Sequence, residues 1–332
     1  MIALLAAVVT LFNARFIGER LGVIDHPDSL RKMHARPTPL VGGLAIMVPL
    51  LIGTALSGVW PVLAADPRMA LAELICGGGA ALVGFVDDRS PVSPAARLVA
   101  LLALTLGALV IDPELLPAAF NWGHLPPTPV VPWLCAALVA LGMAGFVNAV
   151  NMADGQDGCV AGMFVIWAGC ILLAGAGATT GLVTILLATS LAVLAFNLRG
   201  KVFLGGAGAY GVTFVFGLVI LELHNRGIVT AETIIVWFFV PVVDCLRLMI
   251  ARPLQGRSPF DADRNHLHHR LHRRLGDNTG LAIYLGVVAI SSVIAVGMPD
   301  YAPECLAALA CVYAGLIGLT RAKATQIAPR TP

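Results

Sequence analysis

Charged side chains are scarce in this chain. Only 12% of its 332 residues are Asp, Glu, Lys or Arg, whereas 58% are hydrophobic. A soluble globular domain contains about one-quarter charged residues. The scarcity therefore excludes an ordinary soluble protein, and the mean hydropathy of +0.87 favours an integral membrane protein that crosses the bilayer several times.

The sequence also lacks a paired cysteine motif, an internal repeat and a second, soluble domain. Its seven cysteines include no CxxC pair and lie mostly in apolar runs, so we expect them to be small buried apolar residues. The first apolar run, Ile2 to Phe12, continues into Asn13-Ala14-Arg15 without a small-residue cleavage site. We therefore expect a retained first helix and no cleaved signal peptide. Residues 1–332 are interpreted as one transmembrane domain.

Eleven apolar segments match the roughly 17–20 residues that a membrane-spanning helix requires. They cover about residues 1–17, 40–58, 69–86, 95–111, 130–147, 160–175, 179–197, 207–223, 232–250, 280–298 and 302–320. The sequence therefore predicts an all-α, polytopic integral membrane protein with about eleven transmembrane helices.

Basic residues concentrate in every second connection. The connections after the first, third, fifth, seventh and ninth segments, with the C-terminal tail, hold all of the 21 Lys and Arg residues except Arg68 and Arg226. The positive-inside rule then places the N-terminus outside and the C-terminus in the cytoplasm. Nearly all polar, Gly-rich and His-rich clusters fall on the same cytoplasmic side, so we expect one face of the membrane to carry the function.

The stretch 148–158 is the densest polar cluster between two apolar runs. Four polar side chains recur there at steps of three: Asn148, Asn151, Asp154 and Asp157. On a helical turn this spacing keeps them near one face. Two carboxylates at the end of an apolar segment are costly unless they are compensated, and a divalent cation is the obvious compensating group. The alternative is that these side chains only join neighbouring helices by hydrogen bonds.

A second acidic pair, Asp87 and Asp88, ends the third apolar segment. Adjacent carboxylates resist joint ionisation unless a cation or a donor is near. The pair therefore favours a metal, a positively charged partner or proton transfer, and the alternative is a capped helix end with an Asp–Arg surface pair. We expect Arg97, further along, to be an interfacial anchor.

Two other connections contain residues that suit an anionic ligand. In residues 31–43, Lys32 and His34 offer positive donors and Thr38 offers a hydroxyl, which suits a nucleotide diphosphate or, alternatively, lipid headgroups. Residues 201–209 contain Gly205, Gly206 and Gly208 at the start of an apolar segment. Such glycines are typical of a phosphate-binding turn at a helix start, or of tight helix packing by small residues.

The basic connection 251–279 contains a His-rich motif. His266, His268 and His269 follow Arg264, and Asp261 and Asp263 precede them. Histidines in this setting exchange protons, bind metal or contact a phosphate. The lack of an accompanying cysteine argues against zinc, and the excess of arginine favours an anion. A topology signal on a basic interfacial helix is the alternative.

Together these clusters identify the chain as resembling the polyprenyl-phosphate N-acetylhexosamine-1-phosphate transferases, and within them the branch that uses UDP-N-acetylglucosamine. Five motifs carry the resemblance, in the order of the family: K-x-H-x-x-P-T-P-x-x-G-G at 32–43, V-D-D at 86–88, N-x-x-N-x-x-D-G-x-D-G at 148–158, K-V-F-L-G at 201–205 and D-R-N-H-L-H-H at 263–269.

The resemblance implies a reaction at the cytoplasmic face of a bacterial inner membrane. A Mg²⁺-dependent enzyme, with Mn²⁺ as the other metal considered, would move a HexNAc-1-phosphate from a UDP-N-acetylhexosamine to undecaprenyl phosphate and release UMP. The product would start a lipid-linked cell-surface glycan, in lipopolysaccharide or cell-wall biosynthesis. Membrane lipid is the expected surrounding, no nucleic-acid partner is expected, and a homodimer is compatible with the sequence.

The resemblance also implies site residues. The expected catalytic residues are Asp87, Asp88, Asp154, Asp157 and His268, with Asp87 or Asp88 acting on the lipid phosphate nucleophile. The expected substrate-binding residues are Lys32, His34, Thr38, Asn151, Arg264, His266 and His269. Asn148 and Asp154 are the expected metal ligands.

The chain departs from the family pattern after K-V-F-L, where the family has G-D-x-G-S with a metal-binding Asp. Gly206 stands at the position of that Asp, and Ala209 at the position of the Ser. Asp244, Asp261 and Asp263 are candidates to replace the carboxylate. The departure leaves a second hypothesis, a weakened or inactive relative that binds lipid phosphate or nucleotide as a scaffold. A transporter is a third class, but transporters place polar residues near the bilayer midplane.

Overall fold

The computed structural model describes residues 1–27, 36–56, 66–122, 126–259 and 264–320. Its α-helices are α1 (Ile2–Phe12), α2 (Ala14–Leu21), α3 (Gly42–Leu56), α4 (Pro67–Ala72), α5 (Gly78–Arg89), α6 (Pro94–Ile111), α7 (Pro132–Ala153), α8 (Cys159–Ala174), α9 (Thr180–Asn197), α10 (Thr213–Asn225), α11 (Ala231–Ala251), α12 (Leu267–Leu275), α13 (Asp277–Gly297) and α14 (Ala302–Leu319). Two π-helical turns, η2 (Glu73–Gly77) and η5 (Ala207–Val212), lead into α5 and α10.

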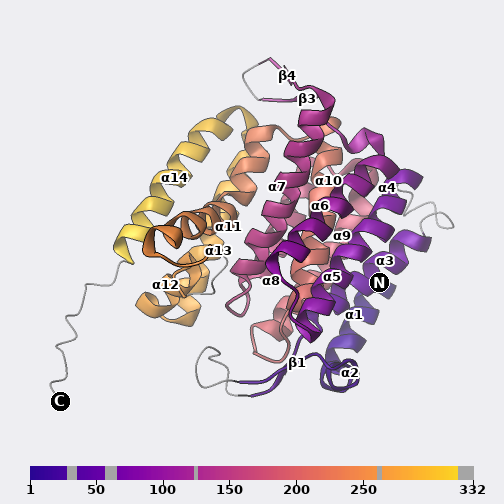
Figure 1. The fold of residues 1–332 in the computed structure, drawn as a ribbon, viewed down its shortest axis with the longest axis vertical. Helices are drawn as coiled ribbons and strands as arrows, with labels where there is room; N and C mark the ends of the chain where they lie inside the picture. The colour runs from indigo at the N-terminus through magenta and orange to yellow at the C-terminus, as the bar shows by residue number, and fades with distance from the viewer. Residues whose placement is uncertain (28–35, 57–65, 123–125, 260–263, 321–332) are drawn as a thin grey trace.

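The helices form a bundle with a short strand pair at each end (Figure 1). At one end β1 (Ile24–Asp25) pairs antiparallel with β2 (Thr38–Pro39), close to α2. At the opposite end β3 (Ala119–Phe120) pairs antiparallel with β4 (Thr128–Pro129). We call these the β1–β2 end and the β3–β4 end.

The polytopic, all-α prediction is confirmed. Among the described residues, eight helices are long and apolar enough to cross a membrane, and a ninth span is formed if α1 and α2, which meet at a bend of 73°, count as one. The helices α3 and α8 are apolar but shorter. Segment 1–17 covers the bent pair α1 and α2, and segment 69–86 covers α4, η2 and α5, so the count of eleven spans stays a prediction.

Local sequence explains where several helices start. Ser93 accepts a hydrogen bond from the Ala96 amide (3.2 Å) and Pro94 follows it, so α6 begins with a capping side chain and a residue that needs no amide partner. Thr230 caps α11 in the same way through the Thr233 amide (3.3 Å). These signals fix the turns that separate one span from the next.

The interior is apolar and aromatic near the middle of the bundle. Trp167 on α8 is fully buried, and its ring lies 5.0 Å from that of Phe238 and 5.7 Å from that of Phe146. Its indole nitrogen donates to the Trp237 carbonyl (3.0 Å), so the polar atom of this buried ring is satisfied.

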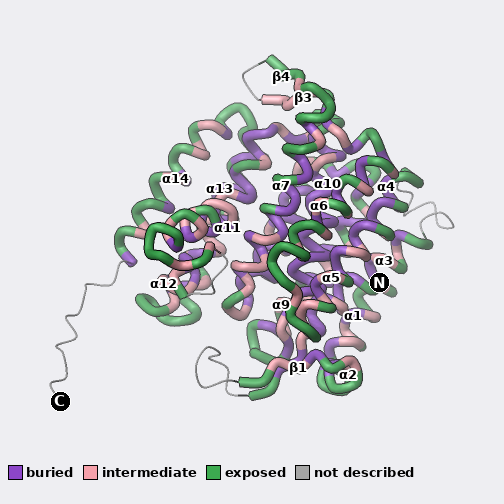
Figure 2. The backbone as a smooth tube through the Cα atoms, in the orientation of Figure 1, coloured by how far each residue is buried: buried purple, intermediate pink, exposed green. Residues whose placement is uncertain are grey.

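Burial separates central from peripheral helices (Figure 2). In the span Ala207–Asn225, 89% of the apolar stretch lies inside the protein, against 17% in Pro299–Leu319. The span that starts with the glycine-rich segment is therefore the centre of the bundle, and α14 exposes apolar side chains to the surroundings.

Glycines bring this central span into backbone contact with two neighbours. A Cβ atom added at Gly43 on α3 would overlap the backbone of Gly208, and one added at Gly206 would overlap the carbonyl of Gly84 on α5. Small residues permit such close approach of membrane helices. Of the two interpretations of residues 201–209, the structure therefore supports tight packing.

We predict that Gly43→Ala lowers the thermal stability of the detergent-purified protein, because the added methyl group has only backbone to displace. Overpacking of this kind costs about 1–3 kcal/mol or more. Gly169→Ala on α8 is the matched control, since no atom lies within 4 Å of its added Cβ. A thermal melt in which the Gly43 variant unfolds no earlier than the Gly169 variant would contradict the packing.

Candidate active site

The 154–158 turn connects α7 to α8 at the β1–β2 end. Asn148 lies on the last turns of α7, where its amide nitrogen donates to the Ala144 carbonyl (2.8 Å) and its amide oxygen keeps its acceptor capacity. The amide of Asp154 donates to the Asn151 carbonyl (3.3 Å), which closes the end of the helix. Gly158 adopts φ of +82°, a conformation that favours glycine, and starts α8.

Asn197, which the sequence reasoning missed, fixes this turn. Its side chain is buried at the end of α9, accepts from the Gly158 amide (2.6 Å) and donates to the Val202 carbonyl (2.8 Å). It also donates to Asp157 (3.3 Å). The available signal was a lone Asn at the end of an apolar segment, four residues before Lys201.

The His-rich motif lies against the same turn. A Cβ added at Gly155 would lie 2.9 Å from the Nε2 atoms of both His268 and His269. Gly155 therefore permits the close approach of two segments that are more than a hundred residues apart in the sequence.

The two histidines are neutral in this environment. His268 is 1% exposed, and neither of its ring nitrogens has a partner among the described residues. Burial, and then the charges of His269 and His266, hold the pKa of His268 well below its ordinary value. Burial, and then the charges of His266 and Arg264, lower the pKa of His269 to about 4. Both rings therefore act as hydrogen-bonding groups near pH 7.

His266, in contrast, is paired with an acid. Its Nδ1 atom lies 2.8 Å from a carboxylate oxygen of Asp244 on α11. Asp244 also accepts from Arg247 (2.8 Å) and Tyr313 (2.8 Å). Because its oxygens are occupied in this way, Asp244 is not available to replace the family carboxylate at Gly206, and that expectation was wrong.

The acidic pair at the end of α5 divides into two different environments. Asp87 accepts from the Val92 amide (2.8 Å) and forms an ion pair with Arg97 (2.6 Å). Asp88 accepts from the Gly206 amide (2.7 Å). Arg97 therefore compensates Asp87, and is more than an interfacial anchor.

The glycine-rich segment 201–209 uses its first amides inside the protein. The anion at the Gly206 amide is the Asp88 carboxylate, from a helix that precedes it by more than a hundred residues. The predicted phosphate-binding turn is therefore filled, at this amide, by a side chain of the chain itself. Gly206 contacts Gly84 so closely that a side chain there would require α5 to move.

The first predicted anion-binding segment joins the same end of the bundle. The amides of Gly42 and Gly43 donate to the carbonyls of Phe203 (3.0 Å) and Leu204 (2.7 Å). Thr38 is buried, and its hydroxyl donates to the carbonyl of Arg36 (3.0 Å). The described part of this motif, residues 36–43, therefore lies beside the motif at 201–205.

Some predicted residues lie outside the described residues: Lys32, His34, Asp261 and Asp263. Arg264 is exposed at the start of the described His-rich segment. The roles assigned to the site residues remain predictions.

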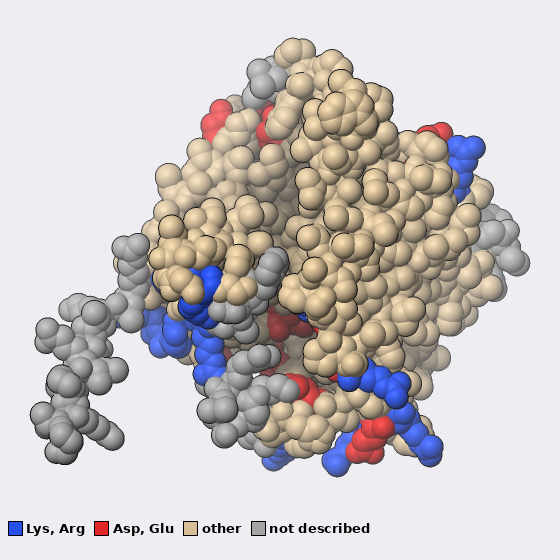
Figure 3. All heavy atoms as spheres, in the orientation of Figure 1, with Lys and Arg blue, Asp and Glu red and all other residues tan. Residues whose placement is uncertain are grey.

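The described residues form what we call the acid–histidine cluster: Asp87, Asp88, Asp154, Asp157, His266, His268 and His269. Charge links its members, since burial, and then the negative charges of Asp88 and Asp157, raise the pKa of Asp154 to about 7. Among the described residues, no hydrogen-bond donor contacts the Asp154 carboxylate, whereas Asp87 accepts from the Arg97 side chain and Asp88 from the Gly206 amide. Figure 3 shows acidic atoms in a hollow at this end, with Lys and Arg side chains around it.

The cluster fits a hard divalent cation in its donor chemistry. Asp154 is a half-buried carboxylate without a donor among the described residues, and Asn148 offers an amide oxygen on α7, the helix that ends at Asp154. The described residues contain no group of three His, Cys, Asp or Glu that could enclose a metal ion. Mg²⁺ suits such a site, because it is usually bound by one or two carboxylates with water and substrate phosphates.

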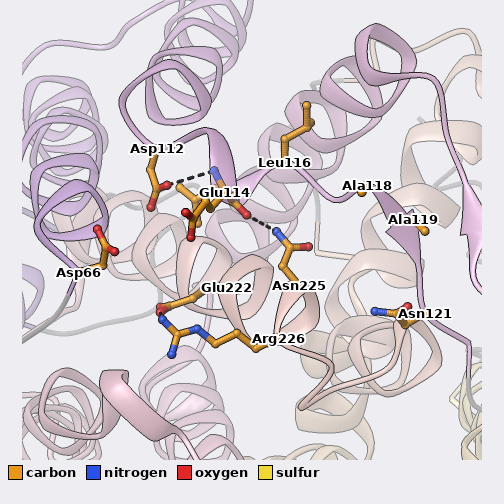
Figure 4. Close-up of a pocket in the computed structure, with 11 residues that line it drawn as sticks. Asp66, Asp112, Glu114, Leu116, Ala118, Ala119, Asn121, Glu222, Asn225 and Arg226 are labelled. Carbon is orange, nitrogen blue, oxygen red and sulfur yellow. Dashed lines mark hydrogen bonds and ion pairs between the residues drawn. The ribbon is translucent and has the colours of Figure 1, made fainter.

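A separate pocket of about 460 Å³ lies at the β3–β4 end (Figure 4). Asp66, Asp112, Glu114 and Glu222 line it, and Arg226 pairs with Glu222 (2.6 Å). The pocket shares no residue with the acid–histidine cluster. Its carboxylates therefore offer control positions for tests of that cluster.

Comparisons with known proteins agree with these observations. A family model described as "Glycosyl transferase family 4" matches residues 70–224. The chain is 30% identical to an undecaprenyl-phosphate alpha-N-acetylglucosaminyl 1-phosphate transferase of Salmonella typhi, over 89% of this chain and 81% of that protein. It is 27% identical to a probable undecaprenyl-phosphate N-acetylglucosaminyl 1-phosphate transferase of Bacillus subtilis, over 81% and 75%. A decaprenyl-phosphate N-acetylglucosaminephosphotransferase of Mycobacterium leprae is 28% identical, over 88% and 82%.

We predict that Asp154→Asn stabilises the metal-free protein at neutral and higher pH. Because the folded-state pKa is about 7, above the ordinary value of about 4, ionising Asp154 costs stability as pH rises between these values. The variant should therefore melt at a higher temperature than the native chain at about pH 8 in chelator, and the difference should shrink toward about pH 4.

Thermal melts across this pH range make the measurement, with the exposed Glu304→Gln as control. A variant that melts lower than the native chain at about pH 8, or whose gain is the same at every pH, would show that Asp154 is not the strained group described.

Proposed function

The chain belongs to glycosyl transferase family 4, and on that premise we propose that it transfers a HexNAc-1-phosphate, GlcNAc-1-phosphate in the first place, from a UDP-sugar to undecaprenyl phosphate. UMP is released, and the lipid-linked sugar starts a cell-surface glycan. The observation that carries the proposal is the meeting of Asp88, Asp154 and the His266–His269 segment at one end of an apolar bundle. The names of the relatives support the acceptor and the sugar.

The reaction joins two anions. An oxygen of the lipid phosphate attacks the phosphorus that carries the sugar, a new P–O bond forms, and the bond from that phosphorus to the bridging oxygen breaks as UMP leaves. Such a transfer depends on positioning and on stabilising negative charge, rather than on a covalent protein intermediate. A site at the end of the bundle gives access both to a lipid in the membrane and to a soluble nucleotide sugar.

Among the two adjacent acids, Asp88 is the better candidate to act on the acceptor phosphate. Asp87 uses both oxygens, one on Arg97 and one on the Val92 amide. Asp88 accepts from the backbone amides of Gly206 (2.7 Å) and Ala207, which orient the carboxylate but add no positive charge to it. We therefore assign the proton acceptor to Asp88 and a positioning role, through Arg97, to Asp87.

On the donor side, His268 and His269 are neutral rings that would hydrogen-bond the diphosphate or the sugar without adding charge. Asp154 and Asn148 would hold Mg²⁺, or Mn²⁺, which when bound would neutralise diphosphate charge. Arg264 lies close enough to His269 to affect its pKa, so it would add positive charge at the entrance.

Gly206 does not favour the alternative of an inactive relative. The position is occupied by backbone contact with Gly84, and its amide holds Asp88. Because residue 206 has no side chain, its backbone packs directly against that of Gly84. Replacing Gly206 with Asp would therefore disturb α5 as well as add a charge, and is a poor test of activity.

We predict that the purified protein releases UMP when it is given UDP-N-acetylglucosamine, undecaprenyl phosphate and Mg²⁺, and that EDTA stops the release. Asp88→Asn should lower the rate by about 100- to 10,000-fold, the usual contribution of a positioned acid or base. Asp154→Asn should also abolish release. Glu114→Gln, in the pocket at the other end, is the matched carboxylate control.

No release by the native chain, alongside an active relative, would exclude the transferase. Full activity of Asp88→Asn would exclude its assignment as proton acceptor, and full activity in EDTA would exclude the metal.

We further propose eleven spans in the bacterial inner membrane, with the N-terminus outside and the acid–histidine cluster at the cytoplasmic face. The alternation of basic connections supports this orientation. In a cysteine-free background, a thiol at Ser90, at the β1–β2 end, should react with a membrane-impermeant reagent only after the inner membrane is opened. A thiol at Arg68, at the other end, should react in intact spheroplasts. The reverse pattern would invert the proposed topology.

A further inference from the structure

One buried carboxylate holds the His-rich segment onto the bundle. Asp244 on α11 is 3% exposed, and it accepts from the Nδ1 atom of His266 (2.8 Å) and the amide of Leu267 (3.0 Å), the two residues at which α12 begins. Arg247, one turn further along α11, donates to its other oxygen (2.8 Å), and so does the hydroxyl of Tyr313 on α14 (2.8 Å). Three helices therefore meet at this side chain.

The geometry fixes the state of His266. A carboxylate that faces four donors is an acceptor only, so the Nδ1 atom of His266 must carry the hydrogen. The ring cannot rotate without leaving a buried charge on Asp244 with one donor fewer. Nε2 is then the ring atom of His266 that faces away from Asp244, and in an imidazolium ring it is a hydrogen-bond donor as well.

His266 is linked to the candidate active site by ring contacts with the neighbouring histidines. The ring of His268 lies nearly parallel to that of His266, at 13°, with 5.6 Å between the centroids. His268 in turn contacts Gly155, next to Asp154, and lies 4.1 Å from the ring of His269. Among the described residues, Asp244 forms no hydrogen bond or ion pair with the 154–158 turn, so its influence on that turn acts through the histidines.

We propose that Asp244 is a positioning residue for the donor substrate: it holds His266 with Nε2 directed to the negatively charged diphosphate of the nucleotide sugar, and it keeps His268 against the Asp154 turn. The proposal rests on the proposed function. It explains why a charged group is buried in α11, where a network that lacks one partner would be costly. It also gives Arg247 a part in holding the carboxylate through its other oxygen.

The test is a double-mutant cycle between Asp244→Asn and His266→Gln, read out as UMP release in purified protein. Asp244→Asn keeps the size of the side chain and removes its charge. We expect kcat/KM for the UDP-sugar to fall about 10- to 100-fold, the loss typical of one charge-assisted hydrogen bond, while KM for undecaprenyl phosphate stays within about twofold. The double variant should be no worse than His266→Gln alone, because both changes remove the same interaction.

Tyr313→Phe is the matched control. It removes one hydrogen bond from the same carboxylate but leaves the contact with His266, so it should lower the melting temperature while kcat/KM stays within about threefold. If Asp244→Asn does not purify as a monodisperse protein, Asp244→Glu keeps the charge and shifts the carboxylate by one methylene group, and it should show the same selective loss for the UDP-sugar.

Losses that multiply in the double variant, or that fall equally on both substrates, would overturn the proposal, since a purely structural role gives those results. An unchanged kcat/KM in Asp244→Asn would also overturn it. Calorimetric titration of the same variants with UDP distinguishes a failure of the Asp244 proposal from a failure of the proposed function. If the native chain releases no UMP, the proposed function is wrong. The same double-mutant cycle, measured as affinity for UDP, then still supports or overturns the role of Asp244.

Discussion

The cost of holding carboxylates at the end of an apolar bundle governs this structure. The acids there are buried or half-buried, so each must be matched by a donor or remain partly uncharged. Asp87 is matched by Arg97, Asp88 by the Gly206 amide, and Asp244 by a ring, a guanidinium and a hydroxyl. Among the described residues, no such partner contacts Asp154, and its raised pKa reflects the cost. It is therefore the acid that a cation or a substrate would most stabilise.

Close backbone packing supplies the geometry in which these acids meet. The central span approaches α3 and α5 through paired glycines, and the same approach brings the Gly206 amide to Asp88. The close packing at these glycines and the placement of Asp88 therefore depend on the same backbone contacts. A residue larger than glycine at 206 would alter both, which is why the departure from the family pattern at this position is structural as well as chemical.

The His-rich segment is held from two sides. Asp244 holds the start of the segment against α11 and α14. Gly155, which has no side chain, leaves space for the imidazoles of His268 and His269 at the 154–158 turn. Burial keeps His268 and His269 neutral, whereas His266 faces a carboxylate. Three histidines in one motif therefore have different environments, and the proposed contacts with an anionic donor follow from that difference.

The sequence by itself determined the all-α membrane class, the helical segments and the polar motifs, because hydropathy and motif spacing are properties of local sequence. It did not determine which donor serves which acid. The bonds Asn197–Gly158, Asp88–Gly206, Asp244–His266 and Asp244–Tyr313 join residues 22 to 118 positions apart. Composition carries no information about such pairs. Only the packing of the spans decides them, because burial forces each polar group to find its partner across the bundle.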